Sequence, residues 1–230
     1  MTDTQARIGI FGGTFNPVHI AHLRAAEEVV GALHLERMIF VPSADPPHKV
    51  DAPGDRLAPA EMRLQWVQLA IRNNPRFEAD ALEVERGGAS YSVDTLRTIG
   101  ERIAPEKPVF CIGQDAFAEI DSWRDPEALF DLAHFAVITR PPVTPASLAD
   151  CLPSCIRNSV ELDPSGDFAR IPRAGTWIRL VEIPALDISS SDIRIRLRDG
   201  ESVRYLLPPE VEEAIQKSGV YCAAQDERGG

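Results

Sequence analysis

The chain has 230 residues, 44% of them hydrophobic, and its 24 basic and 35 acidic residues give a formal net charge of −11. A chain of this length and composition can bury one core, so a single domain is expected. The negative charge argues against a protein that scans nucleic acid or coats an anionic membrane. An anionic ligand would need a local cationic pocket, for which His19, His22, His48 and Lys49 are candidates.

The N-terminal stretch MTDTQARIGI does not resemble a targeting or membrane segment. It has no charged region followed by a long apolar run, and no run in the sequence is long enough to span a bilayer. We therefore expect a cytoplasmic protein. The cysteines are predicted to be buried or incidental thiols, because neither a histidine nor a further cysteine lies near the Cys151/Cys155 pair to complete a zinc site.

Short apolar runs alternate with amphipathic stretches along the first 140 residues. The apolar runs are typical of buried strands and lie at 7–11, 38–42, 108–113 and 134–140. Apolar residues have helical spacing between Leu23 and Leu33, at 60–71 and at 92–103. This alternation predicts βαβ units with at least four parallel strands, in an α/β fold with a Rossmann-like, doubly wound parallel sheet.

The C-terminal third is predicted to be irregular at first and then helical. Residues 141–176 carry several prolines and a DPSGD turn without a sustained period, which predicts an irregular connection or a small insertion. A strand is expected at 177–184, followed by helices at 189–200 and 208–219. The expected domain thus spans residues 1–222, with a small helical part at about 186–222 and a disordered tail at 223–230.

The stretch GGTFNPVHIAH, residues 12–22, directly follows the first predicted strand. Gly12 and Gly13 would let the backbone turn tightly and approach a ligand. A helix that begins near Ile20 would aim its free N–H groups at the same place, which predicts a phosphate site. His19 and His22 lie on one face of the helix entrance, and a histidine pair beside such a loop favours a functional role over a structural one.

This stretch resembles the G-G-x-F-[DN]-P-x-H-x-G-H signature of the nucleotidyltransferase superfamily, whose members join a nucleoside triphosphate to a phosphate-bearing acceptor and release pyrophosphate. Further motifs make the whole chain resemble the bacterial nicotinate-nucleotide adenylyltransferases. They are DPPHK (45–49), SYSVDTL (90–96), IGQDAF (112–117) with SW (122–123), ISSSDIR (188–194) and LLPPEVEEAIQKSGVY (206–221). Asn16, Ala21 and Ser191 depart from the usual Asp, Gly and Thr, but Asn16 can still cap a turn and Ser191 keeps its hydroxyl.

The resemblance implies transfer of the adenylyl group of ATP to nicotinate mononucleotide, which yields deamido-NAD and pyrophosphate in NAD biosynthesis. The acceptor phosphate is already an anion, so alignment and charge stabilisation would carry catalysis. By resemblance the catalytic residues are His19, His22 and Arg194. The implied ATP contacts are Gly12, Gly13, Thr14, Phe15, Lys49, Gly113, Asp115, Ile188, Ser189 and Ser191. The implied acceptor contacts are His48, Tyr91, Ser92, Trp123 and Arg124.

Mg²⁺ is expected to arrive with ATP, because the sequence has no cluster of carboxylates with ligand spacing, and no metal site of the protein is predicted. The expected partners are the two small-molecule substrates, without nucleic acid or membrane, and homo-oligomerisation stays open. Several candidate residues have rival structural roles: Asp115, Ser189 and Ser191 as helix caps, Trp123 in core packing, and His48 and Lys49 in a solvated loop.

Three other functions stay open at this point. The chain could adenylylate a different acceptor, such as nicotinamide mononucleotide, flavin mononucleotide or phosphopantetheine. The HIAH stretch also resembles a motif of class I aminoacyl-tRNA synthetases, although a K-M-S-K-S stretch is missing. Finally, the protein could be a non-catalytic nucleotide sensor of the same fold. Pyrophosphate release from ATP with candidate mononucleotides discriminates among these functions.

Overall fold

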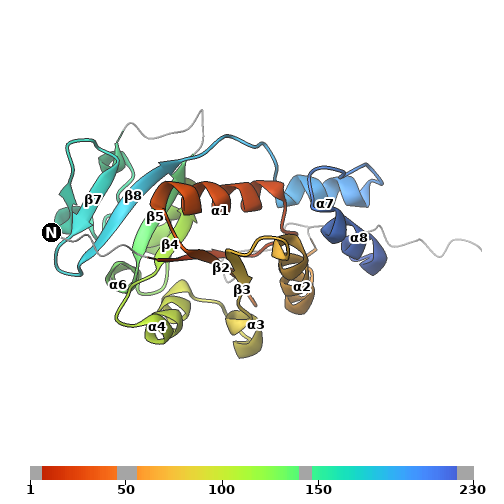
Figure 1. Cartoon of the computed structure of the whole chain (residues 1–230), viewed down its shortest axis with the longest axis horizontal. Coiled ribbons are helices and arrows are strands. Elements are labelled where there is room, and N and C mark those ends of the chain that lie inside the picture. The colour runs from red at the N-terminus through yellow and green to blue at the C-terminus, as the bar shows by residue number, and fades with distance from the viewer. Residues whose placement is uncertain (1–6, 46–55, 140–146, 222–230) are drawn as a thin grey trace, which may run out of the picture.

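A computed structural model of the chain describes residues 7–45, 56–139 and 147–221 and shows helices packed around a central sheet (Figure 1). The sheet has eight strands in the order β3-β2-β1-β4-β5-β8-β7-β6. The first six of these strands pair in parallel, and β7 and β6 are antiparallel. The strands are β1 (Ile8–Gly13), β2 (Arg37–Pro42), β3 (Phe77–Ala79), β4 (Val109–Gly113), β5 (His134–Thr139), β6 (Glu161–Leu162), β7 (Phe168–Ile171) and β8 (Thr176–Glu182).

Helices cover both faces of the sheet. The α-helices are α1 (Ile20–Leu33), α2 (Ala60–Ile71), α3 (Leu82–Arg86), α4 (Ser92–Ile103), α5 (Gln114–Ala118), α6 (Pro126–Leu132), α7 (Ser190–Arg198) and α8 (Pro209–Ser218). Three short 3₁₀ helices are η1 (Ile120–Ser122), η2 (Leu148–Asp150) and η3 (Arg157–Ser159). Helix α1 lies on one face of the sheet, and α4 and α6 lie on the other (Figure 1). The predicted doubly wound α/β fold is therefore confirmed.

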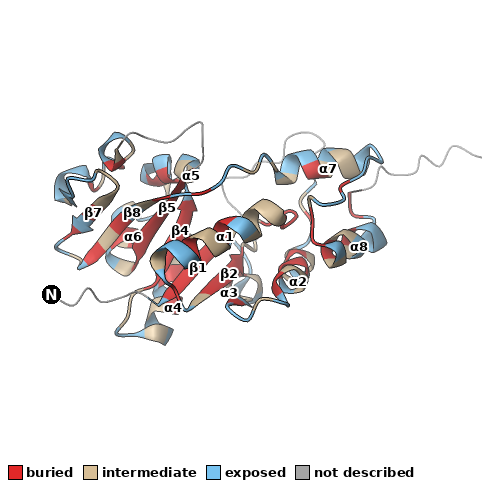
Figure 2. Ribbon diagram, turned by 45° about the horizontal axis from the view of Figure 1, so that its top comes forward, coloured by how far each residue is buried: buried red, intermediate tan, exposed pale blue. Residues whose placement is uncertain are grey.

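Alternate strand residues feed two hydrophobic clusters, one on each face. Phe11 of β1 packs in the cluster that includes Val29 of α1, whereas Ile10 packs in the cluster that includes Leu96 of α4. The buried residues concentrate in the central strands and on the inner sides of the helices (Figure 2). This pattern is what a parallel sheet requires when both of its faces are covered.

The direction of strand addition reverses between β1 and β4. The chain proceeds from β1 through β2 to β3 on one side, and from β4 through β5 to β8 on the other. Phe11 pairs with Cys111 across the two central strands, so Gly13 and Gly113 end at the same edge of the sheet. In open α/β sheets, ligands bind outside the carboxyl ends of the strands at such a reversal point.

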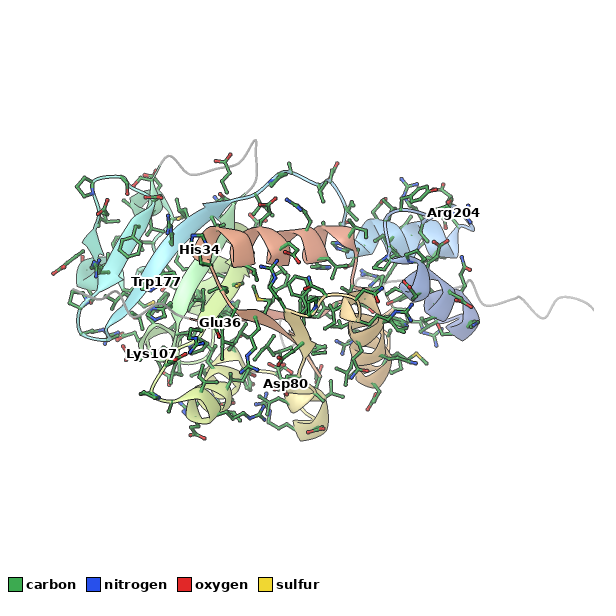
Figure 3. All side chains as sticks on the ribbon, in the orientation of Figure 1. His34, Glu36, Asp80, Lys107, Trp177 and Arg204 are labelled. Carbon is green, nitrogen blue, oxygen red and sulfur yellow. The ribbon has the colours of Figure 1, made fainter. Side chains whose placement is uncertain are left out.

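The amino ends of the strands are joined by polar and aromatic contacts. Nζ of Lys107 donates to the carbonyl oxygens of Asp131 and Ala174, each at 2.7 Å. The rings of His134 and Trp177 stack with their centroids 4.6 Å apart. Lys107 and Trp177 lie at the opposite end of the molecule from Arg204, which follows α7 (Figure 3). The helices α7 and α8 therefore lie near the carboxyl edge of β1 and β2, where a ligand is expected.

Of the two alternatives predicted for 141–176, a small insertion fits part of the range, and an irregular connection is wrong there. Strands β6 and β7 form an antiparallel hairpin that extends the sheet beyond β8. The DPSGD stretch is the hairpin turn, in which Oδ1 of Asp163 accepts the N–H of Ser165 at 3.0 Å. The two strands have only two and four residues, too few to show a period of two. Residues 140–146 and the predicted tail 223–230 lie outside the described residues.

None of the described helices has both the length and the apolar character that crossing a bilayer requires. Of the described cysteines, Cys111 is buried in the central strand β4, and Cys151 and Cys155 are half-buried. Burial raises the pKa of the Cys155 thiol to about 12. All three are free thiols.

Candidate active site

The loop between β1 and α1 turns at a residue other than the one the sequence suggested. Strand β1 continues through Gly12 and Gly13, and neither glycine has a positive φ. The left-handed position is Phe15, with φ 48°. The expectation that the two glycines make the turn is therefore wrong. A non-glycine residue with positive φ is uncommon and occurs preferentially at functional sites.

The two glycines have different steric environments. A Cβ on Gly13 would lie 3.0 Å from Cζ of Phe15, so the ring of Phe15 folds back over Gly13 and would have to shift by a few tenths of an ångström to admit a side chain there. A Cβ on Gly12 would lie 3.5 Å from the Phe110 ring, which is an ordinary contact. Gly12 is exposed at the end of β1. Its lack of a side chain is therefore not needed for packing and leaves the backbone open to a ligand.

His19 and His22 lie together at the start of α1, as their spacing predicts. Their imidazole rings stack with centroids 3.7 Å apart and planes inclined by 27°. Nδ1 of His22 accepts the backbone N–H of His19 at 3.2 Å. The neutral ring of His22 therefore carries its proton on Nε2, which makes that atom a hydrogen-bond donor.

The N-terminus of α7 lies against the same loop. Nη1 of Arg194 donates to the carbonyl oxygen of Asn16 at 2.6 Å, and Nη2 donates to Oγ of Ser191 at 3.0 Å. Oγ of Ser190 donates to the carbonyl oxygen of Pro17 at 2.9 Å. Residues far apart in the sequence thus place the guanidinium of Arg194 beside the loop that precedes the histidine pair.

The serines at this helix start have different roles. Oγ of Ser189 accepts the N–H of Asp192 at 3.0 Å, so Ser189 caps α7 and its rival structural role is confirmed. Ser191 is exposed and contacts Arg194, while Ile188 is half-buried just before the helix. Ser190, which the sequence did not single out, makes the direct contact with the loop.

Asn16 connects three segments instead of capping its own turn. Its Oδ1 accepts the N–H of Ala58 at 3.0 Å and the hydroxyl of Tyr221, and its Nδ2 donates to the carbonyl oxygen of Arg56 at 3.0 Å. The loop after β1 is thereby fixed to the segment before α2 and to the C-terminal end of the described chain. The N–H of Ile20 donates to the carbonyl oxygen of Leu206 at 3.0 Å, which adds a second contact with the C-terminal part.

Three of the predicted acceptor residues gather beside the start of α4. The guanidinium carbon of Arg124 lies 4.6 Å from the ring centroid of Tyr91, in a cation–π arrangement. Nη1 of Arg124 lies 3.7 Å from Oδ2 of Asp94 in the first turn of α4. The half-buried Trp123 packs edge-on against Phe110 at 6.5 Å and belongs to the hydrophobic cluster on that face.

The remaining predicted residues are placed as follows. Gly113 is the N-cap of α5 and Asp115 lies in the first turn, exposed, so the rival role of Asp115 as an N-cap is wrong. Ser92 is the first residue of α4, and Thr14 is half-buried after β1. His48 and Lys49 lie outside the described residues. In the part of the chain that the structure describes, no group of three or more His, Cys, Asp or Glu is placed to hold a metal ion.

The sequence analysis missed a buried arginine. Arg63 in α2 is 0% exposed, and desolvation lowers the pKa of its guanidinium, although nearby acidic groups and Tyr221 oppose this. Its three nitrogen atoms donate to backbone carbonyl oxygens. Nothing in the helical stretch 60–71 marks this arginine as buried, because its partners come from distant loops.

Comparison with known proteins identifies related sequences and folds. The sequence profile of a family described as cytidylyltransferase-like matches residues 10–196. The chain is 41% identical to a probable nicotinate-nucleotide adenylyltransferase of Citrifermentans bemidjiense over 220 residues, covering 95% of this chain and 100% of that protein. It is 36% identical to a protein described in the same words from Thermomicrobium roseum, covering 94% of this chain and 92% of that protein.

The fold also resembles that of solved structures. One is the Plasmodium falciparum nicotinic acid mononucleotide adenylyltransferase complexed with NaAD, with a TM-score of 0.68 at 21% identity. The match covers 94% of this chain and 97% of that one. At this identity the likeness concerns the fold alone.

Proposed function

The chain belongs to the cytidylyltransferase-like family, and on that premise we propose that it transfers the adenylyl group of ATP to nicotinate mononucleotide and releases pyrophosphate. The observation that carries the proposal is the meeting of two helix starts at the end of β1. His19 and His22 come from α1 and Arg194 from α7, and all three lie around the loop 14–18. The positive ends of two helix dipoles, together with cationic or donor side chains at one point, are suited to a polyphosphate.

The proposed reaction is a single in-line displacement. A 5′-phosphate oxygen of nicotinate mononucleotide forms a bond to the α-phosphorus of ATP, and the bond from that phosphorus to the bridging oxygen of pyrophosphate breaks. The attacking oxygen is already anionic at neutral pH, so no side chain has to remove a proton. The protein contributes alignment of the two phosphates and donors for the charge that develops on the phosphoryl oxygens.

Each donor has a defined part in this proposal. Nε2 of His22 donates to an oxygen of the α-phosphate, because its Nδ1 is occupied by the backbone N–H of His19. His19 stacks on His22 and contacts the phosphates beside it. Arg194, held at the loop by the carbonyl oxygen of Asn16, neutralises the departing pyrophosphate.

The remaining assignments follow the family motifs. ATP is held by backbone and side-chain groups of Gly12, Gly13, Thr14, Phe15, Lys49, Gly113, Asp115, Ile188, Ser189 and Ser191. The acceptor is held by His48, Tyr91, Ser92, Trp123 and Arg124. We propose that Mg²⁺ enters bound to ATP as part of the substrate, where it neutralises phosphate charge.

The test is a reaction of the protein with ATP and Mg²⁺ in the presence of one candidate acceptor at a time. The acceptors are nicotinate mononucleotide, nicotinamide mononucleotide, flavin mononucleotide and phosphopantetheine. We expect pyrophosphate release with nicotinate mononucleotide and a product with the mass of deamido-NAD. ATP binding without pyrophosphate release from any acceptor would instead support a nucleotide sensor. Faster turnover of a different acceptor would assign the chain to another branch of the superfamily.

A further inference from the structure

Arg63 is a buried cation whose hydrogen bonds all go to backbone carbonyl oxygens. Nη1 donates to Thr14 at 2.7 Å, Nη2 donates to Ala44 at 2.8 Å and Nε donates to Ala58 at 2.9 Å. The residue is 0% exposed, and the hydrogen bonds of its guanidinium within the described residues all go to backbone oxygens. Burial of a charge without a carboxylate in direct contact is costly, although nearby acidic groups offset part of that cost. Because the burial of Arg63 costs free energy and its hydrogen bonds join three loops, we examine whether this arginine contributes to function.

The three carbonyl oxygens belong to segments that meet at the proposed site. Thr14 lies in the proposed ATP loop, Ala44 lies after β2, and Ala58 precedes α2. The segment after β2 is also tied to the ATP loop directly, because the N–H of Ser43 donates to the carbonyl oxygen of Gly13 at 2.9 Å. Arg63 therefore fixes the backbone of 43–44 relative to the backbone of 13–14.

The segment 43–45, called the Ala44 segment below, also contacts residues 89–92, which we call the acceptor loop. The N–H of Ala44 donates to Oγ of Ser90 at 2.9 Å. The N–H of Ser90 donates to the carbonyl oxygen of Asp45 at 2.9 Å, and Asp45 forms an isolated β-bridge with Ala89. Ser90 directly precedes Tyr91 and Ser92, which are proposed to hold nicotinate mononucleotide. A continuous path of hydrogen bonds thus runs from Thr14 through Arg63, Ala44 and Ser90 to the acceptor loop.

We propose that Arg63 is a positioning residue that sets the distance between the ATP loop and the acceptor loop, acting through the Ala44 segment and Ser90. The inference rests on the adenylyl transfer proposed above. In-line displacement requires the acceptor oxygen and the α-phosphorus to be aligned at short range, so a small shift between the two loops reduces turnover without removing any contact with either substrate. Arg63 itself touches neither substrate in this proposal.

The hydrogen-bond path from Thr14 to the acceptor loop requires a planar guanidinium at position 63. The guanidinium presents donors in three directions, whereas the ammonium of lysine is a point charge on a flexible stem. Arg63→Lys keeps the charge but cannot keep all three hydrogen bonds in the same geometry. Ser90→Ala removes the hydroxyl that accepts the N–H of Ala44, and Ser90→Thr retains a hydroxyl. Arg72→Lys at the C-cap of the same helix is a matched control, because Arg72 is exposed and pairs with Glu210.

The experiment measures kcat and KM for both substrates, the Kd of each substrate alone by calorimetry, and the Tm of every variant. For Arg63→Lys we expect a loss of kcat of roughly 10²-fold, because misplacement of about 1 Å has an effect of that size. The Kd of each substrate alone should change by less than about threefold, because the contacts with each are retained. Ser90→Ala should lower kcat in the same way, Ser90→Thr should restore it, and Arg72→Lys should match the parent.

The double variant provides a further test. Since both residues act through the Ala44 segment, Arg63→Lys combined with Ser90→Ala should lose little more kcat than the worse single variant. Multiplicative losses, or a loss confined to the Kd of ATP, would overturn the proposed coupling. If the Arg63 variant does not fold, the comparison of Ser90→Ala with Ser90→Thr decides, and an unchanged kcat in Ser90→Ala overturns the inference. A parent protein that releases no pyrophosphate overturns the proposed function itself.

Discussion

The imidazole ring of His22 stacks on that of His19 with centroids 3.7 Å apart, and its Nδ1 accepts the backbone N–H of His19. One residue of the pair thus fixes both the orientation and the tautomer of the other. The Nδ1 of His22 accepts this N–H, so the proton of its neutral ring is on Nε2, the atom that can act as a donor. The aromatic ring of Phe15, with its centroid 5.2 Å from that of His22, further limits rotation of the imidazole.

Substitution of His22 by two amides tests which nitrogen acts on the substrate. The amide of glutamine can reach the position of Nε2, whereas the shorter amide of asparagine reaches the position of Nδ1. His22→Asn should therefore lower kcat by roughly 10²-fold or more, which is typical for loss of one preorganised donor, and His22→Gln should retain more activity. Steady-state kinetics with saturating ATP measures both.

His34 provides the matched control for this series. It lies at the end of the same helix, exposed, with φ 53°, a conformation that asparagine tolerates. His34→Asn should leave kcat unchanged. Similar losses at both positions, or equal losses for the two amides at His22, would contradict the role assigned to Nε2.

Alanine substitutions at two glycines of β1 distinguish a role in ligand approach from a role in core packing. Gly12→Ala should leave the free energy of unfolding nearly unchanged, because the added Cβ has ordinary contacts, but it should raise KM for ATP if the backbone approaches the phosphates. Gly9→Ala would place a Cβ 2.7 Å from Sδ of Met38 and 2.9 Å from Cδ1 of Leu35 in the core. It should destabilise the protein by about 1–3 kcal/mol, as overpacking does, with an unchanged KM. Urea unfolding and initial rates on both variants measure this, and a loss of stability in Gly12→Ala would refute the distinction.

The regular parts of the fold could be predicted because their signal is local. Helices α2 and α4 span Ala60–Ile71 and Ser92–Ile103, as the apolar spacing predicts, and the five longest strands follow apolar runs. The hairpin of β6 and β7 could not be predicted, because strands this short depend on pairing with β8 and not on their own pattern.

The residues of the candidate site also divide into those with a local sequence signal and those without one. The histidine pair and the approach of Arg194 follow from motifs, whereas the left-handed Phe15 and the buried Arg63 carry no local signal. A φ of 48° at Phe15 depends on the fit of its ring over Gly13. The burial of Arg63 depends on three carbonyl oxygens that only the folded chain brings together. Both are properties of tertiary structure, which a pattern in one segment does not contain.

The Mg²⁺ concentration that gives maximal turnover should rise with the concentration of ATP. We propose that Mg²⁺ enters with the triphosphate, because phosphate oxygens are ligands that Mg²⁺ prefers. Excess EDTA should abolish turnover and added Mg²⁺ should restore it, with the optimum rising as ATP is raised. The Tm of the protein without ATP should be the same with and without EDTA. A fall in that Tm, or turnover that persists in EDTA, would contradict this proposal.

Stability in acid should depend on Asp121. Burial opposes ionisation of its carboxyl, but hydrogen bonds from Oγ of Ser154 and from the N–H groups of Cys155 and Ser154 outweigh that effect and hold the pKa well below its usual range. A carboxyl whose pKa is lower in the folded than in the unfolded state stabilises the protein above the unfolded pKa of about 4. That contribution is lost as the pH falls from about 4 toward the folded pKa.

Asp121→Asn tests this dependence. The variant should have a lower Tm than the parent at pH 7, and the difference should shrink between about pH 4 and pH 2 as the parent loses the contribution of the ionised carboxylate. Thermal unfolding followed by circular dichroism measures the difference. Asp121 and Glu119 are both exposed, but the hydrogen bonds from Ser154 and Cys155 go to Asp121, so Glu119→Gln removes the same charge and should have a smaller effect. A difference in Tm that does not vary with pH would show that the carboxylate charge is not the cause.

The acceptor loops should discriminate nicotinate from nicotinamide mononucleotide. The two substrates differ only in a carboxylate against a carboxamide, so a site that selects the acid must offer N–H donors without a matching acceptor. The backbone N–H of Trp123 donates to the carbonyl oxygen of Ile120 at 2.9 Å, so the candidate donors are the N–H groups at 91–92 and 124, close to the cation–π pair of Tyr91 and Arg124. The carboxamide would turn its own N–H groups toward these donors, and each unpaired group costs roughly 1–3 kcal/mol.

We therefore expect kcat/KM for nicotinate mononucleotide to exceed that for nicotinamide mononucleotide by at least about tenfold at saturating ATP. Trp123→Ala removes the ring that packs on Phe110 and should loosen the 123–124 backbone, so it should reduce the preference while KM for ATP stays unchanged. Both rates are measured on the parent and on the variant with the same preparation of ATP. Equal kcat/KM values in the parent would overturn the choice of nicotinate as acceptor and leave adenylyl transfer intact. A preference that is unchanged in Trp123→Ala would instead place the discrimination outside the 123–124 loop.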